Sequence, residues 1–260
     1  MQTLPQLDDQ VLGLPWPDFL AWFAPRWEPG QHLNITAPTG EGKTTLGTGI
    51  LSLRKWVLAF DPKGGDKTLR ATGWPRISGQ VDRLGNYLPR EMRKNIADGL
   101  PCRVIVGNVA HTFSALELNW KRQGSLMERV FADEGWTLYV PDIQLLTDPR
   151  MGDVRRAMDM TWIAARDRDI SLVTDMQAFA WTPKLARSQS RWFVVGFTRD
   201  LDSVVDLARA VGRSPSEMRG MVKALKLRPH SWIIFSNAPR DPVVVTIPEP
   251  RKLPQPSRAH

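Results

Sequence analysis

Cysteine is almost absent from this chain of 260 residues, in which Cys102 is the only one. A single thiol excludes an intrachain disulfide and is typical of proteins in a reducing compartment, so we expect a cytoplasmic protein. No apolar run approaches the roughly 20 residues that span a bilayer. Residues 1–30 also lack the basic and apolar segments of a secretory leader. We therefore expect no direct insertion into a membrane.

Several common functional signals are also lacking. The four histidines are scattered and, with one cysteine, form no spacing that is typical of a structural zinc site. The absence of a Gly-x-Ser-x-Gly elbow argues against a serine hydrolase. No repeat and no Gly/Ser linker divides the chain. We expect an N-terminal segment rich in Trp and Pro over residues 1–30, one main domain over 31–247, and a flexible, basic, Pro-rich tail over 248–260.

Basic residues and tryptophans are, in contrast, abundant. The net charge is +8 and the sequence pI is about 10.0, a balance that favours phosphate-rich partners but also fits a generically basic soluble protein. Among the 11 tryptophans, Trp16, Trp22 and Trp27 lie close together in the N-terminal segment. We expect them to pack this segment onto the core. Docking onto a neighbouring subunit and stacking on bases are the alternatives.

Apolar strands alternate with helical segments along the chain. Nearly unbroken apolar runs, which are typical of strands buried on both faces, occur at 56–61 and 103–108. The other strands that we expect cover 32–37, 136–142, 170–176, 191–197, 231–237 and 242–247, and the helices cover 43–54, 112–132, 154–168, 182–189, 200–212 and 214–225. This alternation predicts an α/β fold with a mainly parallel central sheet flanked by helices and a β-hairpin at the C-terminus.

The segment APTGEGKTTL, from Ala37 to Leu46, lies between an expected strand and an expected helix. That context, together with the Gly-Lys-Thr-Thr sequence, indicates the phosphate-binding loop (Walker A motif) of a P-loop NTPase. Backbone N–H groups of such a loop wrap around phosphates, and the following helix N-terminus adds its dipole. Ala37 stands where a glycine is usual, at the end of a strand where a small residue can suffice.

Each residue type in this loop suits part of a nucleoside triphosphate. Gly40 and Gly42 let the backbone approach closely, and Lys43 would reach the β and γ phosphates. Thr44 would place its hydroxyl on Mg²⁺, and Thr45 would lie near the α phosphate. A glycine-rich turn with a solvated lysine is the alternative. The residues predicted to bind nucleotide are therefore Thr39, Gly40, Glu41, Gly42, Lys43, Thr44 and Thr45.

A second motif, VLAFDPKGG at 57–65, follows closely. An apolar strand that ends in Asp-Pro-Lys-Gly, one strand after a phosphate loop, resembles the HerA/FtsK superfamily of DNA-translocating ATPases. That group includes chromosome and plasmid DNA pumps, conjugative coupling proteins and viral genome-packaging ATPases. Asp61, at a carboxyl strand end where open parallel sheets build sites, and Lys63 join the predicted nucleotide-binding residues. An ordinary turn after a strand is the alternative.

The resemblance extends over about residues 30 to 235. RDRDISLVTDMQ at 166–177 resembles the family segment in which a strand ends at a polar sensor, so Gln177 would face the γ phosphate. The stretch 180–212 resembles the part where a short helix leads into a strand and the next helix begins with Asp-Ser. The resemblance implies a RecA-like (ASCE) P-loop NTPase that uses ATP and Mg²⁺, with Lys43 and Gln177 as catalytic residues.

The third core strand of the family usually ends in Asp-Glu, whereas LYVPDIQLL at 138–146 contains no such pair. In one interpretation Asp142 holds the position of the metal-linked Asp, and Ile143 replaces the catalytic Glu. In the other, Pro141 and Asp142 replace the pair, Asp142 activates the water, and Mg²⁺ depends on Thr44 and waters. The apolar turn that follows favours the second. Asp142 is the predicted catalytic residue in both, and Thr44 and Asp142 are the candidate metal ligands.

In this family an arginine from a neighbouring subunit often completes the site by stabilising transition-state charge. Arg187, Arg191 and Arg199 lie in the matching part of the chain, and we prefer Arg191 and Arg199, at the two ends of an expected strand. The resemblance implies a homo-oligomeric ring, a hexamer, that translocates or packages double-stranded DNA. Its contacts with the DNA backbone would be independent of base sequence and sensitive to salt. A portal, capsid or membrane protein is a further candidate partner.

Two basic runs are candidates for DNA contact. The run at 89–95 lies on a polar insertion between expected strands and is the better candidate, and the cluster at 155–168 adds further arginines. A solvated helix face is the alternative for each.

Two other functions compete with the motor. The missing Asp-Glu pair points to a nucleotide-dependent switch or scaffold that binds without hydrolysis. A small-molecule kinase is the second competitor, but no arginine-rich lid segment follows the expected sheet. Stimulation of ATP turnover by DNA would separate a motor from both.

Overall fold

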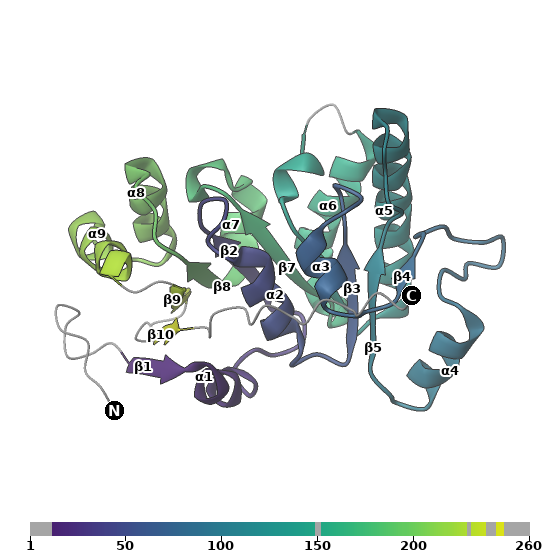
Figure 1. The fold of residues 1–260 in the computed structure, drawn as a ribbon, viewed down its shortest axis with the longest axis horizontal. Coiled ribbons are helices and arrows are strands. Elements are labelled where there is room, and N and C mark those ends of the chain that lie inside the picture. Colours follow the sequence, from purple (N-terminus) through teal and green to yellow (C-terminus); the bar gives the residue numbers. More distant parts are fainter. Residues whose placement is uncertain (1–11, 149–151, 228–229, 238–242, 247–260) are drawn as a thin grey trace, which may run out of the picture.

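The computed structural model describes residues 12–148, 152–227, 230–237 and 243–246 (Figure 1). Their strands form one sheet of ten, in the order β1-β10-β9-β8-β2-β7-β6-β3-β5-β4. The strands are β1 (Leu12–Pro15), β2 (His32–Thr36), β3 (Trp56–Phe60), β4 (Arg76–Ile77), β5 (Cys102–Val106), β6 (Thr137–Val140), β7 (Ser171–Met176), β8 (Ser190–Val195), β9 (Ser231–Ser236) and β10 (Val243–Thr246). The α-helices are α1 (Trp16–Phe23), α2 (Lys43–Leu51), α3 (Lys67–Ala71), α4 (Arg90–Ala97), α5 (Phe113–Asp133), α6 (Asp153–Ala164), α7 (Lys184–Gln189), α8 (Leu201–Ala210) and α9 (Pro215–Ala224).

The sheet is mainly parallel, as predicted. From β8 to β4 every neighbouring pair is parallel, and among the described strands β9 alone runs in the opposite direction. The neighbours β9 and β10 are antiparallel, which confirms the predicted C-terminal hairpin. The sequence did not predict β1 and β4 or the helices α1, α3 and α4.

Helices cover both faces of the sheet (Figure 1). One face packs against α1, α2 and α3, and the other packs against α5 to α9. Successive residues of one strand serve the two faces: Ala59 of β3 belongs to the core beneath α2, whereas Phe60 belongs to the core beneath α5 and α6. Burial on both faces explains the continuous apolar runs in the sequence.

The N-terminal tryptophans pack as expected. Trp27 is buried, and Trp16 and Trp22 are half-buried against the same core as α2. The guanidinium of Arg54 stacks on the ring of Trp27, with its carbon 3.9 Å from the ring centroid, and donates a hydrogen bond of 2.8 Å to the Trp27 carbonyl. The aromatic groups thus join the segment before β2 to the end of α2. The predicted tail at 248–260 lies outside the described residues.

In the described part of the chain, no helix is both long and apolar enough to cross a bilayer.

His32 is a buried imidazole at the start of β2. Its Nδ1 accepts a hydrogen bond of 3.1 Å from the Leu172 N–H. Its Nε2 lies 3.3 Å from the Trp162 carbonyl oxygen, to which the neutral tautomer donates. Burial lowers the pKa of His32 from 6.5 to about 4, despite the opposing effect of the Trp162 carbonyl. The folded protein therefore holds this side chain neutral at physiological pH.

We expect His32 to cost the folded protein stability as the pH falls from 6.5 to about 4. In this range the unfolded chain binds a proton at the imidazole and the folded chain does not, so the free energy of unfolding decreases with falling pH. A shift of this size corresponds to about 3 kcal/mol. Urea denaturation of the wild type and of His32→Asn, at about pH 7 and about pH 4.5, measures the effect.

Asparagine is the matched control because it offers a donor and an acceptor but does not titrate in this range. Between about pH 7 and about pH 4.5, His32→Asn should lose less stability than the wild type, and the difference should be most of the about 3 kcal/mol given above. Asp175, a buried carboxyl whose pKa burial raises to about 6, has the opposite effect, but it is present in both proteins. An equal loss in the two would contradict the prediction.

Candidate functional site

The predicted phosphate loop joins β2 to α2 in the expected strand–loop–helix arrangement. α2 begins at Lys43, and its N-cap is Gly42, whose φ of 87° lies in the left-handed region. Gly40 has a φ of 90°. Glycine adopts such backbone angles at little steric cost, which explains both positions. The first N–H groups of α2 have no partner within the helix and carry the positive end of its dipole, so this helix end can bind an anion.

Local packing explains the alanine at the start of the loop. Ala37 is completely buried, and its N–H donates to the Met176 carbonyl oxygen at 3.2 Å. A Cβ added to Gly196, which follows β8, would lie 2.9 Å from the Cβ of Ala37. The missing side chain of Gly196 therefore makes room for the methyl group of Ala37.

A cavity of about 370 Å³ borders the loop at the carboxyl edge of the sheet. It unites the phosphate loop, the turn after β3 and the carboxyl ends of β6 and β7. Of the residues predicted from the sequence, the cavity is lined by Thr39, Gly40, Gly42, Lys43, Thr44, Thr45, Lys63, Asp142 and Gln177. These segments come together because β2, β7, β6 and β3 are consecutive parallel strands, whose carboxyl ends meet at one edge.

Lys43 is the buried cation of the loop. Its Nζ donates to the carbonyl oxygens of Ala37, at 2.8 Å, and Pro38, at 3.1 Å. Burial lowers the pKa of Lys43, and the negative charge of Asp175 acts in the opposite direction. The ammonium group is thus held by the loop's own backbone, close to buried negative charge.

Asp142 and Lys63 form an ion pair at the cavity. Lys63 Nζ lies 2.5 Å from Asp142 Oδ2, and the lysine side chain is 56% exposed against 14% for the aspartate. Burial alone would lower the pKa of Lys63, but the hydrogen bond and charge of Asp142 raise it overall. The backbone of Asp142 is left-handed, with a φ of 48°, which Asp and Asn tolerate better than most residues.

Asp175 on β7 is a cavity residue that the sequence analysis missed. It is completely buried, and each carboxylate oxygen accepts one hydrogen bond: Oδ2 from the Tyr139 hydroxyl at 2.6 Å and Oδ1 from the Asp142 N–H at 2.9 Å. Burial raises the pKa of Asp175 to about 6, although both hydrogen bonds act to lower it. The sequence signal was an acid inside an apolar strand, two residues before Gln177.

Three further residues line the cavity without having been predicted: Asp66, Thr68 and His230. Asp66 is the N-cap of α3, and its Oδ1 accepts from the backbone N–H of Thr68 at 2.7 Å. His230 precedes β9, whose reversed direction brings its amino end to the carboxyl edge of the other strands. Nothing in the sequence pattern around these residues indicated a site.

Two predicted nucleotide-binding residues, Glu41 and Asp61, do not line the cavity. Asp61 is completely buried in the turn after β3. Its Oδ2 lies 2.8 Å from Arg76 Nη2 and 3.1 Å from the Asp66 backbone nitrogen, which donates to it. The Asp-Pro-Lys-Gly motif therefore contributes Lys63 to the cavity, whereas its aspartate stabilises the turn.

The candidate arginines lie apart from the cavity lining. Arg191 is at the amino end of β8, the edge opposite the cavity, and donates a hydrogen bond of 2.8 Å to Asn237. Arg187 forms an ion pair of 2.7 Å with Asp206. Arg199 follows β8 at the carboxyl edge, is exposed, and has no hydrogen bond or ion pair within the described part of the chain.

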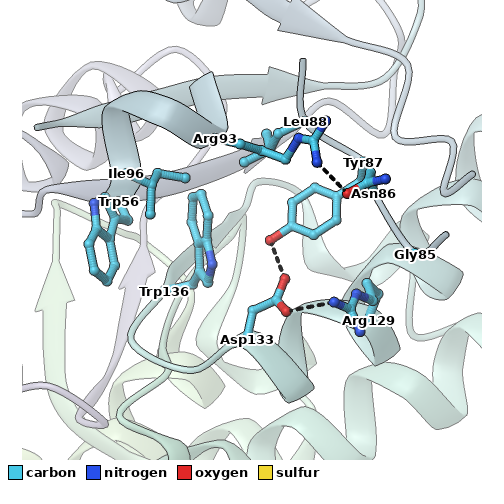
Figure 2. A pocket seen from close by; sticks show the side chains of 10 residues that line it. All are labelled: Trp56, Gly85, Asn86, Tyr87, Leu88, Arg93, Ile96, Arg129, Asp133 and Trp136. Carbon is cyan, nitrogen blue, oxygen red and sulfur yellow. Dashed lines mark hydrogen bonds and ion pairs between the residues drawn. The ribbon is translucent and has the colours of Figure 1, made fainter. Parts of the chain in front are cut away.

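A second cavity, of about 350 Å³, lies at the opposite edge, beside the amino ends of β3 and β6 (Figure 2). Trp56 and Trp136 form one wall. The polar groups pair with each other: the Tyr87 hydroxyl donates to Asp133 at 2.8 Å, and Arg129 lies 3.0 Å from the same carboxylate (Figure 2). Because its acidic group is already satisfied and the phosphate loop does not border it, we place the candidate functional site at the phosphate loop.

The sequence matches no family model, and no curated protein is significantly similar to it. Solved structures do match. The genome packaging NTPase B204 of Sulfolobus turreted icosahedral virus 2, in complex with ATP-gammaS, has a TM-score of 0.53 at 12% identity, over 84% of this chain and 98% of that one. VirB4 of Thermoanaerobacter pseudethanolicus has a TM-score of 0.57 at 10% identity, over 84% and 89%. The bacterial conjugative coupling protein TrwBdeltaN70 has a TM-score of 0.57 at 11% identity, over 85% of each chain.

At these identities the comparisons establish the fold. This chain has the fold of the FtsK/HerA-type P-loop ATPases. The resemblance that the loop, the Asp-Pro-Lys-Gly motif and the segment ending at Gln177 indicated is thereby confirmed at the level of the fold. The predicted P-loop NTPase architecture, with a mainly parallel open sheet between helices, is confirmed with it.

Proposed function

We propose that this protein binds and hydrolyses ATP and uses the released energy to translocate or package double-stranded DNA as a ring of identical subunits. One observation carries the proposal: Lys43 and Thr44 of the phosphate loop share one cavity with Asp142 and Gln177. The fold shared with a genome packaging NTPase and a conjugative coupling protein supports it. The cavity volume of about 370 Å³ is in the range of small-ligand sites.

The donor groups of the cavity fit a magnesium ion. Mg²⁺ takes oxygen ligands and usually binds through one or two carboxylates together with substrate phosphates. The Thr44 hydroxyl and the Asp142 carboxylate, the predicted metal ligands, both line the cavity, and Asp175 adds a second carboxylate. When bound, the ion would neutralise part of the phosphate charge.

The residues of the chain then have distinct tasks. Lys43 would exchange the carbonyl oxygens of Ala37 and Pro38 for the β and γ phosphates, while the loop N–H groups, including that of Thr45, hold the phosphate chain. Gln177 would orient the attacking water. Asp142 would accept the proton of that water, for which it must first release Lys63. Freed from the ion pair, Lys63 would add positive charge near the phosphates.

A neighbouring subunit would complete the site with an arginine. Arg199 is the better candidate, because it is exposed at the carboxyl edge and has no partner in the described part of the chain. Arg191 lies at the other edge and is hydrogen-bonded to Asn237. A ring, which we propose to be a hexamer, would bring such a side chain to each cavity and stabilise transition-state charge.

The DNA contact would come from exposed basic side chains. On α4, Arg90, Arg93 and Lys94 are exposed, and the helix has no buried residue. The net charge of +8 favours a polyanionic partner. In this proposal the protein works in the cytoplasm and is recruited by a portal, capsid or membrane protein.

One observation favours a second function, that of a nucleotide-dependent switch that does not hydrolyse ATP. Pro141 and Asp142 stand where the family has Asp-Glu, and the Asp142 carboxylate is held by Lys63. If the ion pair persists with ATP bound, Asp142 is not free to accept the proton of the water.

We expect double-stranded DNA to raise ATP turnover and high salt to abolish this stimulation, because phosphate contacts release counterions. Replacing Arg90, Arg93 and Lys94 together with alanine should lower DNA affinity and reduce the slope of log affinity against log salt by about three. Filter binding across a salt series and a coupled ATPase assay measure the two effects.

Turnover without DNA is the control, and it should be unchanged in the triple variant because α4 is remote from the cavity. If the protein binds ATP but shows no turnover with any nucleic acid, the nucleotide-dependent switch would be supported and the motor function excluded.

A further inference from the structure

The end of β6 lacks a carboxylate at the position where the resemblance expects the metal-linked aspartate. In the interpretation that makes Asp142 the water-activating residue, that position is Pro141, which is buried. Proline offers neither charge nor a side-chain oxygen. The hydroxyl of Thr44 is then without a carboxylate from its usual strand, and Mg²⁺ normally takes at least one in such sites.

The neighbouring strand, β7, supplies a carboxylate at the corresponding position along the strand direction. β6 and β7 pair in parallel up to Val140↔Thr174, the residues immediately before Pro141 and Asp175, and the Asp142 N–H donates to Asp175 Oδ1. The separation of neighbouring strands is about 4.8 Å. Val173 belongs to the core beneath α2, and Asp175, two residues later, lies on the same face. The carboxylate is thus displaced sideways by one strand and still lies beneath the start of α2.

Tyr139 lies between Asp175 and the phosphate loop. Its hydroxyl donates to Asp175 Oδ2 at 2.6 Å. Burial raises the pKa of Tyr139, and the nearby side chain of Thr44 acts to lower it. Gly47 of α2 permits this contact, since a Cβ there would lie 3.0 Å from the Tyr139 hydroxyl. Tyr139 therefore links the threonine that would hold the metal to the buried carboxylate.

Asp175 has unused binding capacity and forms no ion pair within the residues that the structure describes. Each of its oxygens accepts one hydrogen bond, so two of its four lone-pair sites are free. In the described part of the chain no lysine or arginine lies within ion-pair distance of it, although it is completely buried. Buried charges in proteins are paired or bind metals. Lys43 is the nearby positive charge, and it is hydrogen-bonded to backbone carbonyls instead.

We propose that Asp175 is the carboxylate that holds the nucleotide-bound Mg²⁺ together with Thr44, so that β7 takes over the part that β6 has lost. Asp142 is then left to act on the water, and its N–H positions Asp175 by donating to Oδ1. This inference rests on the proposed nucleotide site and deepens it: the two carboxylates of the cavity have separate tasks.

The test compares nucleotide affinity with and without the metal. The fluorescent analogue mant-ATP is titrated into the full-length protein in MgCl₂ and in EDTA. The dissociation constant in EDTA divided by that in MgCl₂ is the ratio that measures the contribution of Mg²⁺. For Asp175→Asn we expect this ratio to fall at least about tenfold. Affinity in EDTA should be equal or higher, because a negative charge beside the phosphates is removed. A purely structural role for Asp175 would change both affinities together.

Three variants serve as controls. Asp142→Asn should keep the wild-type ratio, and Tyr139→Phe, which retains the Asp175 charge, should keep most of it. The double variant Pro141→Asp/Asp175→Asn returns a carboxylate to β6 and should regain the ratio. Asp175→Ser, whose smaller side chain leaves room for a water, replaces Asp175→Asn if the latter does not fold.

A wild-type ratio in Asp175→Asn, combined with a lost ratio in Asp142→Asn, would overturn the inference and leave the proposed function intact. The absence of mant-ATP binding in the wild type would overturn both.

Discussion

Replacing Lys43 with alanine is expected to weaken ATP binding about 100-fold. The Nζ group is buried at the start of α2 and would exchange two carbonyl partners for the β and γ phosphates. Hydrogen bonds to charged groups contribute about 1.5 to 3 kcal/mol each. Because Lys43 gives up two carbonyl bonds when it binds the phosphates, we take the lower end of this range, about 3 kcal/mol for two bonds, which is a factor of about 100. Titration with mant-ATP in MgCl₂ measures the change.

Lys67→Ala is the matched control, since Lys67 begins α3 nearby but is exposed and does not line the cavity. We expect its affinity for ATP to be that of the wild type. Equal affinities in Lys43→Ala and the wild type would show that the loop does not bind phosphate.

Replacing Asp142 with asparagine is expected to reduce ATP turnover by about 10² to 10⁴-fold while ATP affinity changes little. The amide cannot accept a proton, whereas the backbone is preserved because asparagine tolerates the φ of 48° at this position. A coupled ATPase assay, together with the mant-ATP titration, separates the effect on turnover from the effect on binding.

The substitution also removes the ion pair with Lys63, and Lys63→Met controls for this. That variant loses the same ion pair but retains the carboxylate. We expect weaker ATP binding and measurable turnover from it. Turnover at the wild-type level in Asp142→Asn would exclude Asp142 as the group that accepts the proton.

The elements that the sequence predicted share a local signal. The run at 56–61 became β3 because a strand buried on both faces needs apolar residues at every position. The helix expected over 214–225 became α9, in which Ser214 accepts a hydrogen bond from the Glu217 N–H, and a serine with a glutamate three residues later is typical of a helix start. In both cases the interactions that define the element lie within a few residues of it.

The elements that were missed lack such a signal. β4 has two residues and exists only because Arg76 and Ile77 pair with β5. α4 has no fully buried residue, and only Met92 and Ile96 pack against the core, so the apolar signal in its sequence is weak. The placement of Asp61 depends on the same pairing, since the guanidinium that binds its carboxylate belongs to β4. A strand end was therefore correctly predicted, but the direction of its side chain was not.

The sequence by itself determined eight of the ten described strands, the phosphate loop and the resemblance to a family of ATPases, because each depends on residues adjacent in the chain. Only the tertiary structure brought Asp175 into the cavity that Thr44 lines. Asp175 reaches that place because β7 pairs between β2 and β6, and the order of strands in a sheet follows from contacts between segments more than 100 residues apart, such as Asn34 and Thr174. Local sequence patterns do not predict pairings between such distant segments, so the complete set of site residues is found only in the folded structure.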